Sequence, residues 1–410
     1  MLQEVVFLPL MPAAPHAGTE SANQPWAQLR AQMPALANKT YFNYGGQGPL
    51  PEPSLQAIVE CWQRIQQLGP FTGDVWPYLD QVSSGLRGRL AQWFGVGPHR
   101  ISLTENVTSG CVLPLWGLPW QAGDELLVSD GEHPGVVAAC RELARRLNLQ
   151  LQVFPVIDLR GDTDSAVAGA LAALERGLSP RTRLVVLSHV LWNTGQVMPI
   201  AAAAERLQAE PCPPWLLVDA AQCLGNLAVQ EAAAAADIYA CTGHKWSCGP
   251  EGLGAMVLSE RLLEQASPTL IGWRSLREET SAGSSFHRDG RRFEVATSCL
   301  PLQAGLDRSL QLLEGCGDAQ VRSARIQALG SRLWRGLREL ESVSPLLESP
   351  PTAGLVSFSI EGSAPEAVVG RLGAQAIWLR TLANPHCLRA CTHITTTEAE
   401  VDRLLEALCP

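Results

Sequence analysis

Residues 236–255 read ADIYACTGHKWSCGPEGLGA, and the lysine inside this stretch stands in an unusual place. Lys245 follows the apolar run DIYAC, which is typical of a buried strand, and it precedes a loop rich in glycine and proline. A lysine with a structural role belongs on a solvated face, because burying an unpaired ammonium group is costly. The stretch therefore predicts a strand and a turn in which Lys245 has either a carboxylate partner or a chemical role.

The rarity of lysine sharpens this question. The chain has 31 Lys plus Arg, and only two of them, Lys39 and Lys245, are lysines. Arginine stays charged at any ordinary pH, whereas a desolvated lysine can lose its proton and become a nucleophilic amine that forms a Schiff base. A lysine paired with a carboxylate, in a sequence that simply favours arginine, explains the count equally well. The neighbouring motifs must decide between the two interpretations.

The composition excludes several classes of function. A net charge of -9 and the lack of a run rich in Lys and Arg argue against binding to nucleic acid, and no apolar run is long enough to span a membrane. The twelve cysteines form no CxxC pair, so we expect neither a metal site nor a disulfide framework. The first residues include a glutamate and no basic segment, which does not fit a signal peptide. We expect a cytoplasmic enzyme or binding protein that acts on a small molecule.

From about residue 100 the sequence alternates short apolar runs with helical segments. Continuous apolar strands separated by helices predict an α/β fold with a largely parallel sheet that helices cover on both faces. We expect an N-terminal arm at 1–37, a large domain at 38–290 and a smaller α+β domain at 291–410. A long helical stretch is expected in the smaller domain from about 301 to 342.

Polar residues follow the predicted strands of the large domain, where ligands bind in such folds. Asp219 and Gln222 end the strand in WLLVDAAQ, and the carboxylate fits an ion pair or the protonated pyridine nitrogen of pyridoxal phosphate. Thr108 and Ser109 in LTENVTSGC begin a helix and fit either a plain cap or a phosphate cradle. His133 in SDGEHPG is a loop histidine or an aromatic face over a cofactor ring. Together with Lys245 they favour a pyridoxal phosphate site.

The motifs DAAQCLG (219–225) and TGHKWSCGPEGLG (242–254) resemble the cofactor core of the class V, fold-type I aminotransferases, the group that contains the cysteine desulfurases. The resemblance covers residues 38–408 and implies the fold-type I architecture, with a sheet of the seven-stranded type in the large domain. It implies that Lys245 forms the Schiff base with pyridoxal 5′-phosphate and acts in catalysis.

The resemblance also assigns the other contacts to the cofactor. Asp219 would pair with the pyridine nitrogen, Gln222 would contact the phenolic oxygen, and His133 would stack on the ring as a second catalytic residue. The residues implied at the phosphate are Thr108, Ser109, Thr242 and His244. The match of FEVATS implies that Thr297 reaches the phosphate of a neighbouring subunit, so we expect a homodimer.

One segment predicts the branch of the family. Cysteine desulfurases carry a reactive cysteine on a loop between two arginines, which correspond to Arg380 and Arg389 in WLRTLANPHCLRACTH. Only eight residues separate them here, and Cys387 lies at the base of the shortened segment. The stretches YFNYGGQGPLP, LIGWRS and DGRRFEVATS resemble the L-cysteine/cystine C-S lyases, which use no such cysteine. This resemblance implies that Arg380, Arg389, Gly46 and Trp273 contact the substrate.

The sequence therefore predicts a carbon–sulfur lyase that converts cystine or cysteine to pyruvate, ammonia and persulfide or sulfide, with Lys245 accepting the α-proton. Three alternatives stay open. The chain could be a cysteine desulfurase, a class V aminotransferase or lyase that acts on another amino acid, or a regulatory protein that binds pyridoxal phosphate without catalysis.

Overall fold

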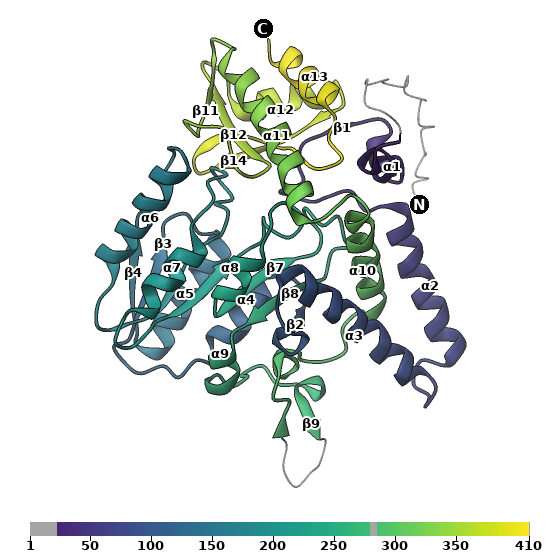
Figure 1. The fold of residues 1–410 in the computed structure, drawn as a ribbon, viewed down its shortest axis with the longest axis vertical. Helices are drawn as coiled ribbons and strands as arrows, with labels where there is room; N and C mark the ends of the chain where they lie inside the picture. Colours follow the sequence, from purple (N-terminus) through teal and green to yellow (C-terminus); the bar gives the residue numbers. More distant parts are fainter. Residues whose placement is uncertain (1–22, 279–284, 410) are drawn as a thin grey trace, which may run out of the picture.

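A central mixed sheet organises the computed structural model, which describes residues 23–278 and 285–409 (Figure 1). Residues 1–22 of the predicted N-terminal arm lie outside the described residues. In the described part the sheet has seven strands in the order β2-β8-β7-β6-β5-β3-β4, and only β8 runs against its neighbours. The strands are β2 Ile101–Thr104, β3 Glu125–Ser129, β4 Gln150–Phe154, β5 Thr182–Val186, β6 Trp215–Asp219, β7 Ile238–Thr242 and β8 Gly254–Leu258. The predicted α/β fold with a mostly parallel sheet is confirmed.

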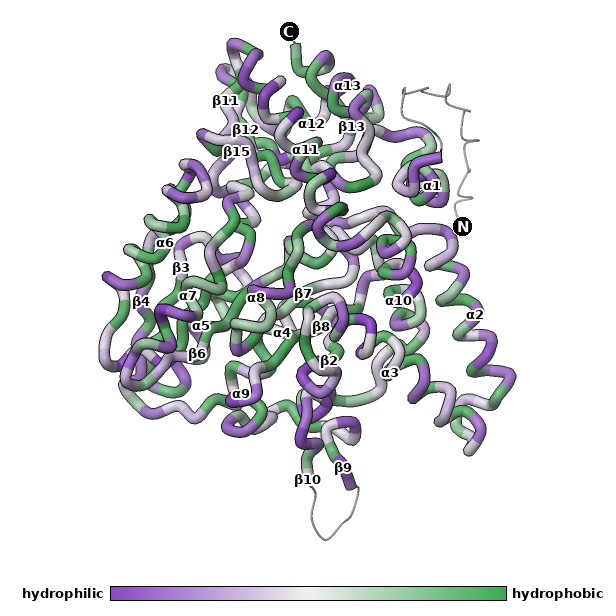
Figure 2. Tube along the Cα trace, in the orientation of Figure 1, coloured by the Kyte–Doolittle hydropathy of each residue, from purple (hydrophilic) through white to green (hydrophobic). Residues whose placement is uncertain are grey.

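Side chains of the sheet alternate between two hydrophobic cores on its two faces. In β5, Val185 belongs to one core while Leu184 and Val186 belong to the other. Both faces are covered, and for that reason β6 and β7 are buried at every position and are continuously apolar up to their last residue. Figure 2 shows the same pattern, with hydrophobic strands inside and mixed helices outside.

Two different sets of helices cover these faces. The first core includes side chains of α3 Val75–Phe94, α6 Thr163–Gly177, α7 Ile200–Gln208 and α8 Gln230–Ala235. The second includes side chains of α4 Val107–Leu115, α5 Pro134–Leu147 and α9 Glu260–Gln265. The parallel strands all end at one edge of the sheet, so the segments after β3, β5, β6 and β7 meet there.

The C-terminal part contains a second sheet, four antiparallel strands in the order β11-β12-β15-β14. These strands are β11 Val343–Pro345, β12 Leu355–Ile360, β14 Arg380–Ala383 and β15 His386–Cys391. They share a core with the helices α11 Ala319–Arg338, α12 Pro365–Gly373 and α13 Glu398–Leu408.

The helical stretch predicted over 301–342 is divided in the structure. It forms α10 Leu300–Glu314 and α11, because Gly317 adopts a φ of 113° and the Asp318 side chain caps the second helix at the Val321 amide. Helix α10 packs on α3 and on α2 Glu52–Leu68 rather than on the smaller sheet. The domain boundary near residue 290 stays a prediction, with α10 lying between the two parts.

The described N-terminal residues pack against the C-terminal part of the fold. The helix α1 Pro25–Ala31 carries Arg30, which forms a bidentate ion pair with Glu400 on α13. The turn η1 Pro34–Leu36 follows, and then β1 Thr40–Tyr41 pairs in parallel with β13 Ile377–Trp378. These contacts bring residues 43–48 to the edge of the large sheet.

The remaining short elements are η2 Pro98–Arg100, η3 Trp273–Ser275, β9 Leu276–Glu278, β10 Ser285–Phe286 and η4 Gly290–Phe293. Of these, β9 and β10 pair with each other on the underside of the fold in the orientation of Figures 1 and 2. Within residues 23–278 and 285–409, no helix combines the length and apolar character that crossing a membrane requires.

Candidate functional site

Lys245 lies in the turn between β7 and β8, at the edge where the parallel strands end. The turn is closed by hydrogen bonds from the Gly243 amide to the Leu253 carbonyl (2.9 Å) and from the Cys248 amide to the Lys245 carbonyl (3.0 Å). Within the described residues, the Lys245 ammonium group has no hydrogen-bond or ion-pair partner. Burial lowers the pKa of Lys245 to about 8, an effect that the negative Asp219 opposes. At pH 7 about a tenth of the amine is therefore neutral and nucleophilic, far more than for an ordinary lysine.

Asp219 and Gln222 come from the end of β6 and the turn after it. The Asp219 carboxylate is almost fully buried and accepts a hydrogen bond from the Ala221 amide (2.9 Å). The Gln222 carboxamide donates to the Gly45 carbonyl (3.0 Å) and accepts from the indole of Trp246 (2.8 Å). These bonds fix the orientation of the Gln222 amide and leave one of its two N–H donors for a ligand.

His133 caps the N-terminus of α5 after β3. Its Nδ1 accepts a hydrogen bond from the Gly135 amide (3.2 Å), which leaves the proton on Nε2. Burial lowers the pKa of His133, so the ring is neutral at neutral pH. The ring also meets the indole of Trp192 edge-on, with centroids 5.5 Å apart. A neutral imidazole in a fixed orientation is suited to stacking on a flat ligand.

The residues predicted at a phosphate come from two neighbouring elements. Thr108 and Ser109 lie in the first turn of α4, where the Ser109 amide already donates to the Asn106 side chain (2.9 Å). Helix α4 packs on β7, and Thr242 at the end of β7 is hydrogen-bonded to His244 Nδ1 (2.8 Å). Burial lowers the pKa of His244, and the charge of Lys245 adds to that effect. The set offers hydroxyl and amide donors near a helix N-terminus, as anions prefer.

Arg380 and Arg389 face each other across the β14–β15 hairpin, where they are direct register partners. Arg389 is 1% exposed, and its Nη1 donates to the Trp192 carbonyl (2.7 Å). Its Nε and Nη2 are buried and have no partner in the described residues. Arg380 is exposed, and its Nε donates to the Thr381 carbonyl (3.3 Å). Two free donors on a planar guanidinium fit a carboxylate ligand.

The glycine-rich segment after β1 lies over this cluster. A Cβ added to Gly45 would come 2.9 Å from Arg389 Nη2 and 3.0 Å from the Gln222 oxygen. A Cβ added to Gly48 would lie 2.1 Å from the Lys245 carbonyl. A Cβ on Gly46, the residue that the sequence predicted, would instead meet the side chain of Asn43 at 2.7 Å. The residue that touches the arginine is therefore Gly45.

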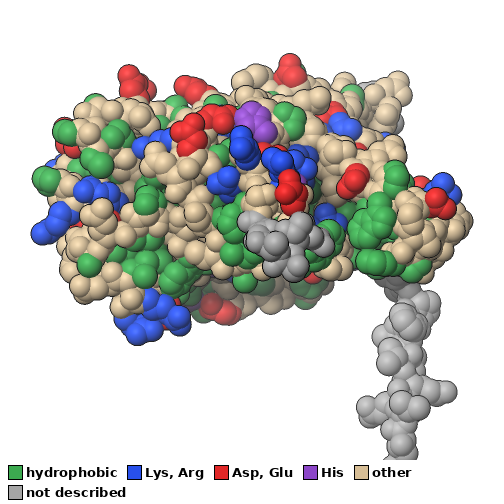
Figure 3. All heavy atoms as spheres, turned by 90° about the horizontal axis from the view of Figure 1, so that it is seen from below, with side chains coloured by type: hydrophobic (Ala, Val, Ile, Leu, Met, Phe, Trp, Pro, Cys, Tyr) green, Lys and Arg blue, Asp and Glu red, His purple; other side chains and the backbone are tan. Residues whose placement is uncertain are grey.

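Trp273 and Thr297 lie close to each other, in a separate groove. The Trp273 indole donates weakly to the Thr297 hydroxyl (3.5 Å) and meets Trp76 edge-on at 6.2 Å. The groove has a volume of about 600 Å³ and is largely hydrophobic, and Phe71 at its rim is 84% exposed. Figure 3 shows hydrophobic side chains exposed on this underside of the molecule. Among the described residues, the contacts of Trp273 and Thr297 do not include Lys245 or Arg389.

Four cysteines near this site are enclosed, and burial raises the pKa of each thiol. Cys387 is 1% exposed, and burial raises the pKa of its thiol to about 11. Burial likewise raises the pKa of Cys241 to about 12 and raises the pKa of Cys223 and Cys248. Because the thiolate is the nucleophile, these thiols are unreactive near neutral pH.

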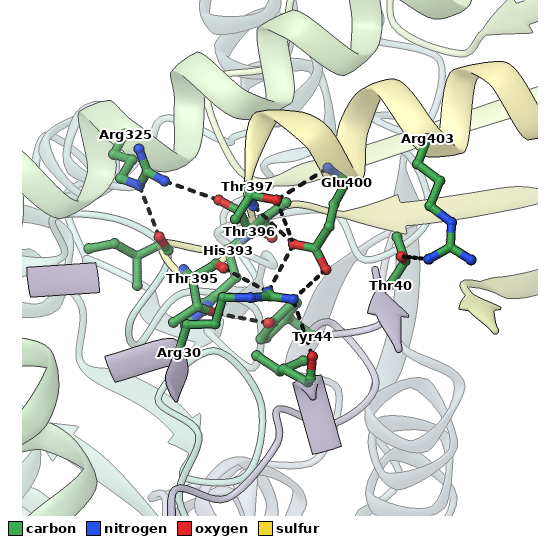
Figure 4. Close-up of polar contacts among 12 residues, drawn as sticks. Arg30, Thr40, Tyr44, Arg325, His393, Thr395, Thr396, Thr397, Glu400 and Arg403 are labelled. Atoms are coloured by element: carbon green, nitrogen blue, oxygen red, sulfur yellow. Dashed lines mark hydrogen bonds and ion pairs between the residues drawn. The ribbon is translucent and has the colours of Figure 1, made fainter. Parts of the chain in front are cut away.

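A buried hydrogen-bond chain that sequence reasoning missed supports the Lys245 turn. His393 Nε2 is 2.9 Å from the Trp246 carbonyl, and its Nδ1 is 2.9 Å from the Thr395 hydroxyl. Tyr44 is hydrogen-bonded to the same hydroxyl (2.9 Å) and stacks on the imidazole at 4.3 Å. Figure 4 shows this chain reaching Arg30 and Glu400. The only signal in the sequence is the helix cap formed by Thr397 and Glu400. It indicates where a helix begins but not which residues the preceding turn contacts.

The gathered groups fit pyridoxal 5′-phosphate. An amine without a partner in the described residues, a buried carboxylate, a neutral imidazole and a set of hydroxyl and amide donors follow strands β7, β6, β3 and β2 of the large sheet. They match the aldehyde, the pyridine nitrogen, the ring face and the phosphate of that cofactor. The orphaned donors of Arg389 add a place for the carboxylate of an amino acid.

Comparisons with known proteins agree with this arrangement. The model of the family "Aminotransferase class-V" matches residues 53–404. A solved structure of the cystine C-S lyase C-DES with its product cysteine persulfide is 42% identical, with a TM-score of 0.88 over 92% of this chain and 100% of that one. Another C-DES structure holds glycine covalently linked to its PLP cofactor.

Two curated relatives carry other names. Isopenicillin N epimerase of Streptomyces clavuligerus is 28% identical over 93% of this chain and 97% of its own length. A probable cysteine desulfurase of Pseudomonas aeruginosa is 32% identical over 73% of this chain and 72% of its own.

Proposed function

The chain belongs to the class V aminotransferase family of pyridoxal-phosphate-dependent enzymes, and from this premise we propose that it is a carbon–sulfur lyase. It breaks the bond between the β-carbon and sulfur of L-cystine or L-cysteine by β-elimination. The sulfur leaves as cysteine persulfide or sulfide, and the remaining three-carbon unit takes up water and gives pyruvate and ammonia.

The observation that carries this proposal is the 42% identity to the cystine C-S lyase C-DES, which extends over 92% of the chain. The β14–β15 hairpin supports it, since only two residues connect the strands. A desulfurase must bring a thiolate to the substrate sulfur, and a short hairpin with a buried, protonated Cys387 does not supply one.

Each residue of the site has a task in this proposal. Bound pyridoxal phosphate supplies a sink for the electrons released when the α-proton leaves. Lys245 holds the cofactor and accepts that proton at Nζ, for which a pKa of about 8 is well placed. Asp219 would hold the pyridine nitrogen and Gln222 the phenolic oxygen. The residues that would bind the phosphate are Thr108, Ser109, Thr242 and His244.

Binding of the substrate falls to the arginines and to His133. Arg389 holds the α-carboxylate through its two free donors, while Arg380, which is exposed at the rim, engages the far carboxylate of cystine. His133 would stack on the cofactor ring and keep it in place. Gly46 stays a predicted contact, with Gly45 as its neighbour at Arg389.

We further propose a homodimer in the cytoplasm. The hydrophobic groove around Trp273 and Thr297 supports the dimer, because a second copy would cover it and bring Thr297 to the phosphate of the partner's site. Twelve free cysteines support a reducing compartment. Mixing a Lys245→Ala chain with a Thr297→Ala chain should restore activity above that of either parent, and equal or lower activity would contradict the shared site.

Product analysis of the purified holoenzyme tests the function. We expect pyruvate, ammonia and persulfide in equal amounts from cystine. Alanine together with a persulfide on the protein would identify a desulfurase instead. Exchange of the α-proton in D₂O with retention of the β-substituent would favour an epimerase, the activity named for the Streptomyces relative. A protein that binds the cofactor but acts on no amino acid would be a regulator.

A further inference from the structure

A buried carboxyl group directly precedes His133 in the chain. Glu132 belongs to the segment between β3 and α5 and is 6% exposed. Its Oε1 accepts hydrogen bonds from the Ser129 hydroxyl (2.6 Å) and the Ser188 amide (2.6 Å), and its Oε2 accepts one from the Ser188 hydroxyl (2.7 Å). Ser129 ends β3 and Ser188 follows β5, so this side chain joins the segments after two neighbouring strands, at the edge of the sheet where the site lies.

A second buried carboxylate, that of Asp219, lies at the end of β6, the next strand beyond β5. The segment after β5 contacts it as well, because the His189 amide donates to the Asp219 carbonyl (3.0 Å). Burial raises the pKa of Glu132, and the negative charge of Asp219 adds to that effect, so that the pKa reaches about 7. Two carboxyl groups that influence each other are thus buried at the edge where the site lies.

No cation is paired with Glu132 in the described residues. Besides Asp219, it faces the thiols of Cys111 on α4 and Cys140 on α5. Burial raises the pKa of both thiols, so they carry no charge near neutral pH, and the adjacent His133 is neutral there as well. Two carboxylates buried together are unfavourable unless a positive charge offsets them. The charge that fits is the protonated pyridine nitrogen of the cofactor, for which Asp219 is the expected partner.

We propose that Glu132 is a positioning residue for the cofactor, a second buried anion that acts through Asp219 to hold the positive charge of the pyridine ring. This inference rests on the proposed role of Asp219 and not on the cleavage of cystine. The carboxyl group can hold or lose its proton without moving, because the Ser188 hydroxyl can accept from the protonated form or donate to the ionised form. A positive ring favours the ionised form, so binding of the cofactor releases this proton to the solvent.

Glu132→Gln removes the charge and can keep all three hydrogen bonds, because the amide oxygen accepts at the Oε1 position and the amide nitrogen donates to the Ser188 hydroxyl. Equilibrium dialysis of the holoenzyme against known concentrations of free pyridoxal phosphate gives the dissociation constant of the cofactor. At pH 8 the variant should bind the cofactor about tenfold more weakly than the parent, which corresponds to one pKa unit at Glu132. At pH 6, below the pKa of about 7, the two should differ by about twofold or less.

Glu125→Gln is the matched control. Glu125 is 3% exposed, accepts hydrogen bonds from two hydroxyl groups, and begins β3, at the end of the strand away from the site. This variant should bind the cofactor as the parent does at both pH values. Equal weakening in Glu132→Gln at pH 6 and pH 8 would show that the side chain only packs the site, and unchanged binding at pH 8 would show that the cofactor does not sense its charge. Either result overturns the proposal.

Ser188→Ala keeps the proposal testable if the glutamine variant does not fold. It leaves the carboxyl group in place but removes a hydroxyl that donates to it, and such a bond is stronger to the ionised form than to the protonated one. The pH below which the cofactor binds more weakly should therefore rise, and an unshifted pH would also overturn the proposal. No measurement here involves cystine turnover, so this result and the test of the lyase activity are independent of each other.

Discussion

Replacing His393 by phenylalanine should destabilise the turn that carries Lys245. The imidazole is fully buried, and its Nε2 faces the Trp246 carbonyl. Because a carbonyl can only accept a hydrogen bond, Nε2 carries a hydrogen and donates to it. Nδ1 then accepts from the Thr395 hydroxyl. Phenylalanine keeps the stack on Tyr44 but leaves the Trp246 carbonyl without its donor, while the Thr395 hydroxyl keeps only its hydrogen bond with Tyr44. At about 1–3 kcal/mol for one buried unsatisfied group, the loss is about 1–3 kcal/mol.

Urea unfolding of the holoenzyme measures this loss, with tryptophan fluorescence reporting the fold and visible absorption reporting the bound cofactor. His393→Gln is the matched control, because its amide can donate to the carbonyl and accept from the hydroxyl. We expect the glutamine variant to recover more than half of the lost stability and to hold the cofactor more tightly than the phenylalanine variant. A loss below about 1 kcal/mol in the phenylalanine variant would refute the reasoning.

The pH dependence of stability provides a second readout on the same residue. Burial lowers the pKa of His393 to about 3, against 6.5 in an unfolded chain. Between pH 6.5 and about 3, His393 is protonated in the unfolded chain and neutral in the folded chain. The free energy of unfolding therefore falls as the pH falls below 6.5. The contribution is about 1.4 kcal/mol per pH unit. His189, whose pKa burial lowers to about 4, adds a similar slope in parent and variant alike. His393→Gln should therefore show the shallower dependence, and an unchanged slope would contradict a neutral buried imidazole.

Three further outcomes are expected. Lys245→Ala should lower cystine turnover at least about a thousandfold, and borohydride should fix the cofactor to Lys245 in the parent, so labelling elsewhere would contradict its role. Arg389→Lys keeps the charge but loses the planar fork, and it should raise the KM for cystine about tenfold or more with the cofactor spectrum unchanged; an unaltered KM would remove it from the carboxylate site. Replacing Cys387 and Cys391 together by alanine should leave pyruvate formation from cystine within about threefold of the parent, whereas an inactive variant would point to a protein persulfide.

The sequence predicted the elements whose signals are local. The strands β6 and β7 are continuously apolar, since both of their faces are covered, and each ends in a residue of the site. The lysine turn follows directly from such a strand. The break between α10 and α11 also has a local signal, because Gly317 is followed by the helix cap Asp318. The sequence nevertheless predicted one long helical stretch, because helix-like apolar periodicity continues on both sides of the break.

The parts that could not be predicted depend on contacts between distant residues. Trp192 and Arg389 are 197 positions apart, and His393 lies 147 positions beyond the carbonyl to which it donates. Whether a buried donor has a partner is decided by such pairs, and no period or motif encodes them. The approach of Gly45 to Arg389 is a smaller case, because the sequence alone does not say which glycine of this segment faces the arginine, while the substrate contact predicted for Gly46 stays a prediction.

The burial of Arg389 explains how the site can select its substrate. Arg389 is 1% exposed and has no carboxylate partner among the described residues. Its guanidinium has therefore lost its hydration without gaining an opposite charge, and burial lowers its pKa. An amino acid restores the missing charge when its carboxylate binds, while an amine without a carboxylate leaves two buried donors unpaired. Sites built on hydrogen bonds reject ligands that cannot complete them far more strongly than hydrophobic pockets reject ligands of the wrong size. With Arg389 at the α-carboxylate, as proposed, recognition of that group would be strict, and the sulfur-bearing side chain, which would extend toward the exposed Arg380, would be left to looser control.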